Sequence, residues 1–137
     1  MAALSKDRFV WRRDGHINRV ALKAGARIFK GALVCTDGGY GVPGADTAGL
    51  RFAGVALESA DNTGGANGAL EIRVWQTGVF PVAKPGAAAA DIGAEVACVD
   101  DQTVNLLSVT TADIRCGRVV AVLNSGEVEV KLDGYAY

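Results

Sequence analysis

The sequence predicts an all-β protein, a compact jelly-roll-like β-sandwich or a β-barrel that carries an extended arm at its N-terminus. Several short segments alternate apolar and polar residues with a period of two, as half-buried strands do. Turn signals rich in Gly, Asn and Asp separate these segments. No long amphipathic helix is predicted. About nine short strands joined by Gly-rich turns are typical of sandwiches and barrels.

Length and composition set the outer limits of this prediction. The chain has 137 residues, of which 50% are hydrophobic and 21% charged, so it suits one folded domain and not a disordered chain. We expect an arm over 1–16, a single β domain over 17–133 and a tail over 134–137. Charged residues interrupt the start of the chain before a signal-peptide core forms, and no apolar run is long enough to span a bilayer.

The strands are predicted in chain order from alternation and from the turns that bound them. The clearest is 127–132, in which Val128, Val130 and Leu132 face the core. The segment 70–74 repeats this pattern with Leu70, Ile72 and Val74. The other predicted strands are 19–22, 28–35, 52–58, 79–83, 95–99, 103–107 and 115–123. The Ala-rich stretch 87–90 lies between Pro-Gly and Gly, which leaves room for at most about two helical turns.

An internal repeat is visible between the two halves of the chain. The segment 31–37 resembles 93–100, and the segment 54–57 resembles 117–120 at nearly the same spacing. A true duplication implies two similar sheets or half-barrels around one core. The alternative is chance similarity among strands built from Gly, Ala and Val.

Charge is divided unevenly along the chain. The segment 1–30 holds eight basic and two acidic residues, a net +6, while the segment 31–137 holds six basic and thirteen acidic residues, a net −7. The basic end includes Arg8, Phe9, Trp11, Arg12 and Arg13, a mixture of Arg and aromatic residues that suits docking onto an acidic surface. Nucleic-acid binding is an alternative, but a pI of about 5.8 argues against an extended electropositive face. The other alternative is that this segment is simply the first strand of the fold, with its charged side chains in water.

Motifs for catalysis or cofactor binding are weak. The Gly-x-Gly-x-x-Gly string at 39–44 has no helix after it, so a surface turn is predicted instead of a dinucleotide site. Cys116 lies between two arginines, and His16 offers a base for Cys35, but small buried strand cysteines are the favoured interpretation. Three cysteines without metal-type spacing and one histidine argue against a transition-metal site and fit a reducing compartment.

Neither of the nearest carboxylate pairs supports glycoside chemistry. Asp100 and Asp101 are predicted in a turn, and Glu127 and Glu129 on the outer face of a strand.

Exposed aromatic residues indicate contacts with another surface. Trp75 is predicted on the outer face of its strand, where a second sheet, a subunit or a sugar ring would cover it. Together with Tyr135 and Tyr137 of the tail, it is a candidate subunit contact. The alternative is a carbohydrate-binding β-sandwich that stacks sugars on Trp75, Tyr40 and Tyr135.

The order of several segments resembles the capsid cement, or head decoration, proteins of tailed bacteriophages. The resemblance covers roughly 25–132 and rests on a Gly-Val-Ala strand in 52–60 and a Gly-Val-Phe step in 74–80. An Ile-Gly-x-x-Val strand in 92–96 and a closing valine-rich hairpin over 117–132 complete it. The arm before residue 17 is outside it.

The resemblance implies a structural virion protein, made in the host cytoplasm, that binds the outside of an icosahedral head and clamps neighbouring major capsid subunits. Such proteins act as small homo-oligomers, dimers or trimers, at capsid symmetry axes. The implied partners are the major capsid protein and further copies of the chain, with no cofactor, enzymatic activity, nucleic acid or membrane. A small hydrolase using Cys116 or Cys35 is a third hypothesis.

Overall fold

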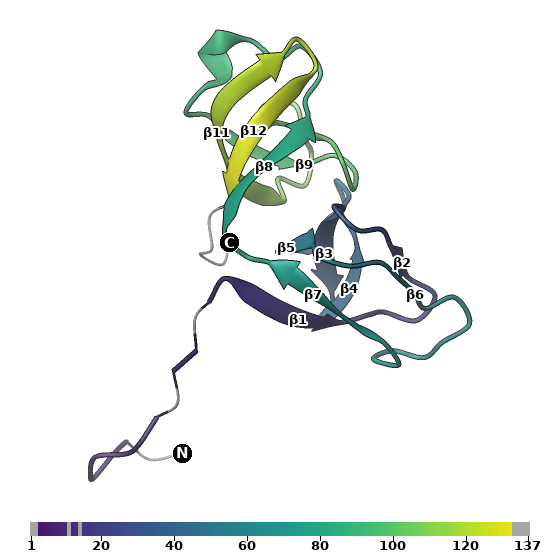
Figure 1. Ribbon diagram of the computed structural model, residues 1–137, viewed down its shortest axis with the longest axis vertical. Helices are drawn as coiled ribbons and strands as arrows, with labels where there is room; N and C mark the ends of the chain where they lie inside the picture. The colour runs from purple at the N-terminus through teal and green to yellow at the C-terminus, as the bar shows by residue number, and fades with distance from the viewer. Residues whose placement is uncertain (1–2, 11, 14, 133–137) are drawn as a thin grey trace.

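The computed structural model describes residues 3–10, 12–13 and 15–132, and it confirms the all-β prediction. Figure 1 shows two groups of strands, one built from the first half of the chain and one from the second. The strands of the first group are β1 (Ile17–Ala21), β2 (Arg27–Ile28), β3 (Leu33–Asp37), β4 (Tyr40–Pro43), β5 (Arg51–Ala56), β6 (Ala60–Asp61) and β7 (Glu71–Trp75). The second group contains β8 (Gly78–Ala83), β9 (Glu95–Cys98), β10 (Val104–Leu106), β11 (Arg115–Asn124) and β12 (Glu127–Leu132), with a 3₁₀ turn η1 (Ala89–Asp91).

Each group forms one five-stranded antiparallel sheet, and β2 pairs with β6 in a small separate sheet. The N-terminal sheet has the order β1-β7-β5-β3-β4 and the C-terminal sheet the order β10-β9-β11-β12-β8. Both sheets curl until their edge strands approach. A parallel bridge joins Leu22 to Gly41 in the first, and another joins Ala83 to Thr103 in the second. Neither sheet is a closed barrel.

The two sheets share one topology, so the repeat in the sequence is a repeat of structure. Taken in chain order, β1, β3, β4, β5 and β7 correspond to β8, β9, β10, β11 and β12, and this correspondence converts one strand order into the other. Hydrogen bonds correspond as well. The N–H of Gly31 donates to Ala56 O at 2.9 Å, and the N–H of Gly93 donates to Val119 O at 2.8 Å.

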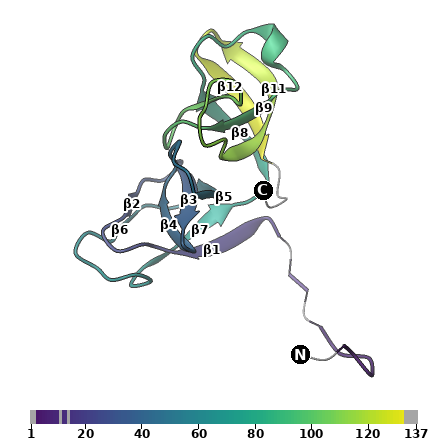
Figure 2. The same cartoon turned by 180° about the vertical axis from the view of Figure 1, so that it is seen from behind.

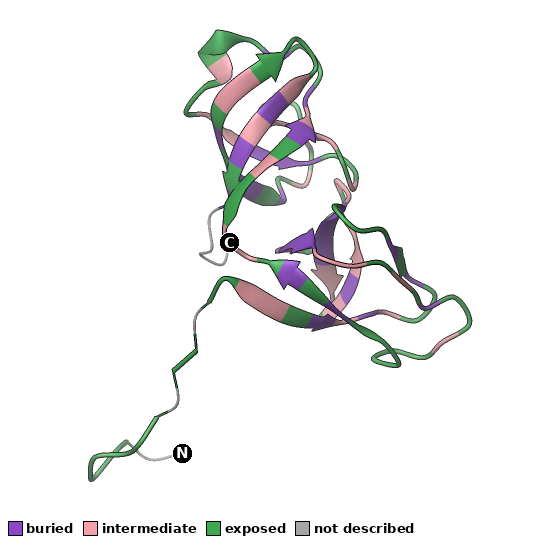
Figure 3. Ribbon diagram, in the orientation of Figure 1, coloured by how far each residue is buried: buried purple, intermediate pink, exposed green. Residues whose placement is uncertain are grey.

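The core is organised around the first three residues of β3, which are buried on both faces of the sheet. Val34 packs among the apolar residues enclosed by the curl of the N-terminal sheet, including Val20, Ile72 and Val74. Leu33 and Cys35 point to the opposite side and join the core of the C-terminal sheet. The two sheets therefore share an apolar core, and Figure 3 shows the buried positions following the strands of both.

Polar contacts close the junction between the sheets. The carboxylate of Asp46, in the loop after β4, accepts hydrogen bonds from the N–H groups of Thr111 at 2.9 Å and Ala112 at 2.7 Å. The N–H of Asp46 donates to Val99 O at 3.2 Å, and the N–H of Leu33 donates to Asp101 O at 2.7 Å. These bonds pair backbone groups across the junction, including the N–H of the buried Leu33, which would otherwise lack a partner.

Several sequence predictions need correction. The segment 28–35 is not one strand, because a turn at Gly31 divides it into β2 and β3. The turn predicted at 39–44 contains β4, which pairs with β3. Leu70, predicted to face the core, precedes β7 and is 40% exposed. The alternation of β12 is confirmed, since Val128, Val130 and Leu132 are all buried.

A buried ion pair joins the end of β8 to η1. Lys84 is 3% exposed, and its Nζ lies 2.9 Å from Oδ2 of Asp91. The same carboxylate accepts a hydrogen bond from the N–H of Ala88 at 2.9 Å. The hydrogen bond with Lys84, followed by that with Ala88, lowers the pKa of the Asp91 carboxyl below its ordinary 3.8. The repeat places Lys23 near the equivalent position, where it pairs with Asp37 at the surface.

The duplication predicts that two glycines at equivalent positions, Gly54 and Gly117, do not tolerate a side chain. A Cβ on Gly54 would overlap the carbonyl oxygen of Trp75, and a Cβ on Gly117 would overlap that of Lys131. We expect Gly54→Ala and Gly117→Ala each to lower the free energy of unfolding by about 3 kcal/mol, measured by urea denaturation. The control Gly15→Ala has open space around it and should change stability by less than about 0.5 kcal/mol. Wild-type stability in either core variant would contradict the prediction.

The Lys84–Asp91 pair predicts a dependence of stability on pH. Because the pKa of Asp91 is lowered in the folded protein, its contribution is present above pH 3.8 and is lost as the pH falls through its folded-state pKa. Asp91→Asn should therefore be less stable than wild type at pH 7, with a smaller difference at pH 3. The control Asp37→Asn removes a half-exposed pair and should cost at most about 0.5 kcal/mol. Equal differences at both pH values would contradict this assignment.

Candidate functional site

The arm is the most exposed part of the molecule. Figures 1 and 2 show it running away from the body of the protein before β1 begins. Residues 3–10 and 12–13 are all exposed and form no strand, and the side chain of Phe9 is 80% exposed. Arg8 and Arg12 are exposed on either side of it. Trp11, also predicted in the docking segment, lies outside the described residues.

The root of the arm is fastened to the body. The guanidinium of Arg13 donates to Ile17 O at 3.2 Å and to Oδ1 of Asn18 at 2.9 Å. His16 Nδ1 lies 2.9 Å from Oγ1 of Thr77, and the carbonyl of His16 accepts a hydrogen bond from the N–H of Gln76 at 2.8 Å. The arm therefore leaves the body at a fixed point, beside the segment that links the two sheets.

Trp75 lies on the outer face of β7, as the sequence predicted. Glu71, Arg73 and Trp75 are exposed, while Ile72 and Val74 between them are buried. Trp75 keeps 37% of its surface exposed and is paired across the sheet with Ile17 at the start of β1. An exposed indole thus lies next to the root of the arm. Tyr135 and Tyr137, the other two candidate subunit contacts, lie outside the described residues.

The edge strand β1 continues this exposed surface. The hydrogen bonds between His16 and Gln76 and between Leu22 and Leu70 show that the even-numbered residues of β1 bond to β7. In an antiparallel ladder the alternate residues then direct their N–H and C=O groups away from β7. For Ile17 and Arg19 this direction is the free edge of the sheet, where the Ile17 carbonyl accepts the bond from Arg13.

The other edges are protected by features that oppose strand addition. Pro43 lies in edge strand β4 and Pro81 in edge strand β8, and proline removes an N–H donor from the edge. Of the remaining edge strands, β10 has 3 residues, and β2 and β6 of the small sheet have 2 residues each. Within the described chain, β1 is therefore the edge best suited to bind an extended segment of another molecule.

The cysteines do not form an accessible nucleophile. Cys35, Cys98 and Cys116 are free thiols with no exposed surface. Contact with Cys98, and then burial, raises the pKa of the Cys35 thiol, while contact with Cys116 raises that of Cys98. The interpretation of small buried strand cysteines is confirmed.

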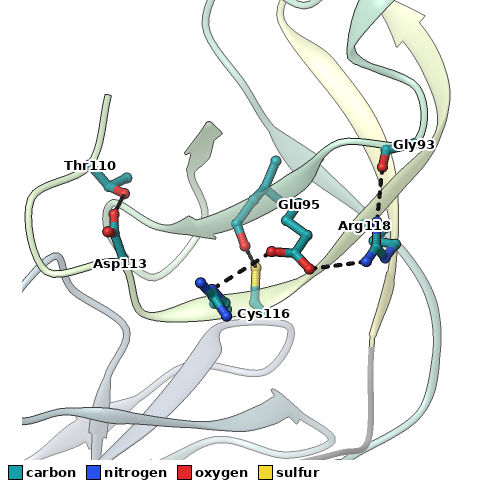
Figure 4. Close-up of polar contacts among 8 residues, drawn as sticks. Gly93, Glu95, Thr110, Asp113, Cys116 and Arg118 are labelled. Atoms are coloured by element: carbon teal, nitrogen blue, oxygen red, sulfur yellow. Dashed lines mark hydrogen bonds and ion pairs between the residues drawn. The ribbon is translucent and has the colours of Figure 1, made fainter. Parts of the chain in front are cut away.

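The arginines that flank Cys116 face away from it. Both bind the carboxylate of Glu95, with Arg118 Nη2 at 3.0 Å and Arg115 Nε at 3.7 Å from its oxygens. Figure 4 shows the contact between Arg118 and Glu95. Cys116 instead lies 3.6 Å from Val96 O. His16, the base considered for Cys35, contacts Thr77 at the root of the arm.

The carbohydrate-binding alternative is not supported by the placement of its aromatic residues. Trp75 lies at the end of β7 that pairs with Ile17. Tyr40 lies at the start of β4 with its ring near Gly68, close to the opposite end of β7. The two rings therefore do not share one platform. Tyr135 is outside the described residues.

Asp100, one of the carboxylates considered for glycoside chemistry, lies in the predicted turn and accepts a hydrogen bond from Gln102 N–H.

No cluster of His, Cys, Asp and Glu with metal-binding geometry occurs among the residues that the structure describes. The described part of the chain also has no helix that is long and apolar enough to cross a membrane. Comparison with known protein families, with characterised proteins and with solved structures gave no match.

The exposed side chain of Phe29 is a feature that the sequence pattern did not predict. Phe29 is 54% exposed, and the guanidinium of Arg27 lies 4.8 Å from the centre of its ring. The prediction of a single strand over 28–35 treated Phe29 as an ordinary strand residue. The signal that was available is the large apolar residue set between Arg27 and Lys30, immediately before the Gly31 turn.

The burial of the thiols predicts their reactivity. Iodoacetamide should modify none of the three cysteines in the native protein at neutral pH and all three after denaturation in urea, as counted by mass spectrometry. Rapid modification of a native thiol would contradict this burial and would restore the thiol hydrolase hypothesis.

Proposed function

We propose that this protein is a capsid decoration protein, which binds the outer surface of an icosahedral phage head and clamps neighbouring major capsid subunits. The observation that carries the proposal is the exposed basic arm, which leaves a compact β body at a fixed root. The resemblance of segments over 25–132 to the cement proteins of tailed phages supports the same function.

The docking surface in this proposal combines the arm with the edge of β1. Arg8 and Arg12 supply positive charge for an acidic region of the major capsid protein, and Phe9 supplies an apolar anchor. The free edge of β1 and the exposed Trp75 lie directly beyond the root. A partner bound along the arm would continue onto this edge without moving the body.

The mechanism requires no catalysis. Each copy adds a modest interface energy, and a copy that touches two capsid subunits links them, so that many copies together stabilise the shell. The charged part of the contact should weaken as salt rises, because exposed charges are screened over about 8 Å at physiological ionic strength.

The arm provides the direct test. Deleting residues 1–16 should leave a folded body that no longer co-sediments with undecorated, expanded phage heads, whereas the full chain binds them and binds less at higher salt. A gentler variant, Arg8→Ala with Phe9→Ala and Arg12→Ala, leaves the Arg13 contacts at the root in place and should weaken binding at least about tenfold.

A matched control changes exposed charge elsewhere. Lys131→Ala, on the outer face of the C-terminal sheet, should bind heads like the wild type. Unchanged binding after loss of the arm would show that the arm does not contribute to head binding. A full-length chain that does not bind heads would overturn the proposal.

A further inference from the structure

Two exposed patches of opposite charge lie on the body, away from the arm. The first, here named the Phe29 patch, consists of Arg27, Phe29 and Lys30. Phe29 is more than half exposed and borders an open hollow of about 430 Å³ that also includes Ser59 and Asp61. Nη1 of Arg27 lies 4.0 Å from Oδ2 of Asp61, so the net positive charge of the patch is that of Lys30. Arg and aromatic residues are the types that most often dominate the energy of protein interfaces.

The second patch, here named the Asp101 patch, consists of Val99, Asp100, Asp101 and Val109. Val109 lies two residues before Thr111, whose N–H donates to the Asp46 carboxylate, and the N–H of Asp46 donates to Val99 O. Val109 is 61% exposed and Val99 37% exposed, so the patch has an apolar part as well as two carboxylates. The sequence from 85 to 114 contains no Lys or Arg but five acidic residues. Asp91 and Glu95 are neutralised by Lys84, Arg115 and Arg118, whereas Asp100 and Asp101 form no ion pair with any residue that the structure describes.

The two patches are neighbours on the surface. The N–H of Leu33 donates to Asp101 O at 2.7 Å, which fixes the acidic turn against the start of β3. Phe29 precedes Leu33 by only four residues, a chain length that spans at most about 14 Å. Each copy of the protein therefore presents a basic aromatic patch beside an acidic aliphatic one.

The Phe29 patch is absent from the second repeat, which serves as an internal control. Aligning Gly31 with Gly93 places Arg27 on Ala89 and Phe29 on Asp91, in the 3₁₀ turn η1. There the Asp91 side chain folds back onto Lys84. Because the shared topology does not require an exposed Phe with a stacked Arg at this position, its presence in one repeat indicates a role at the surface.

We propose that two copies of the protein pair about a two-fold axis, with the Phe29 patch of each copy against the Asp101 patch of the other. Adjacent patches of opposite charge are self-complementary in this arrangement, as an interface about a two-fold axis must be. Lys30 and Arg27 face Asp100 and Asp101, and the Phe29 ring covers Val109. This pairing does not use the arm, so it goes beyond the proposed function and leaves the arm available for the capsid.

Charge reversal tests this pairing in the full-length chain. Sedimentation velocity over the micromolar range should show a reversible monomer–dimer equilibrium for the wild type. Lys30→Glu and Asp101→Lys should each weaken the dimer at least about tenfold, because each places like charges opposite one another twice per dimer. An equimolar mixture of these two variants should dimerise again, to within about threefold of wild type, since opposite charges then face each other at both contacts.

Two controls separate this result from misfolding and from the arm. Lys131→Glu reverses an exposed charge outside both patches and should not change dimerisation, and circular dichroism should confirm that every variant is folded. Head binding is measured in a separate experiment, so the dimerisation result can be interpreted even if the protein does not bind heads. A monomeric wild type, single variants that dimerise normally, or a mixture that stays monomeric would each overturn the pairing.

Discussion

The structure depends on the burial of both faces of β3. In most two-layer β proteins a strand divides its side chains between core and solvent, but here Val34 faces the inside of the N-terminal sheet while Leu33 and Cys35 face the other sheet. Because Leu33, Val34 and Cys35 have no solvent face, this part of β3 fixes the position of both sheets at once. The polar backbone at this junction must then find partners inside the protein, and Asp46 supplies them to the loop before β11.

Duplication explains the shared topology, and the differences between the two repeats explain why the packing stops at two sheets. The face of β3 and β5 that carries Leu33 and Val55 is covered by the C-terminal sheet. The equivalent positions in the second repeat are Glu95 and Arg118, which form an ion pair in Figure 4. A charged pair at this position disfavours covering by a further sheet, because burying it would require desolvation of both groups.

Local pattern accounts for much of the fold and long-range contact for the rest. The alternation of apolar and polar residues correctly predicted β12 and the outward Trp75, because one face of each strand is buried and the other faces solvent. The same rule failed at β4, whose Tyr-Gly-Val-Pro sequence has the composition of a turn and is a strand only because it pairs with β3. Asp46 bonds to Thr111 and Ala112, which are 65 and 66 positions further along the chain. The apolar–polar pattern of a short segment carries no information about contacts between residues so far apart.

For the candidate site, composition predicted an exposed basic arm but not how the arm is fixed. Ordering an extended segment on a partner costs conformational entropy for each residue that it immobilises, which limits the affinity of one copy. Arg13 and His16 reduce this cost at the root, because their hydrogen bonds order that end of the arm before any partner arrives. Only the outer part must then be ordered on binding. A modest affinity per copy is compatible with a decoration function, because a symmetric shell presents many equivalent sites and linked copies bind with increased avidity.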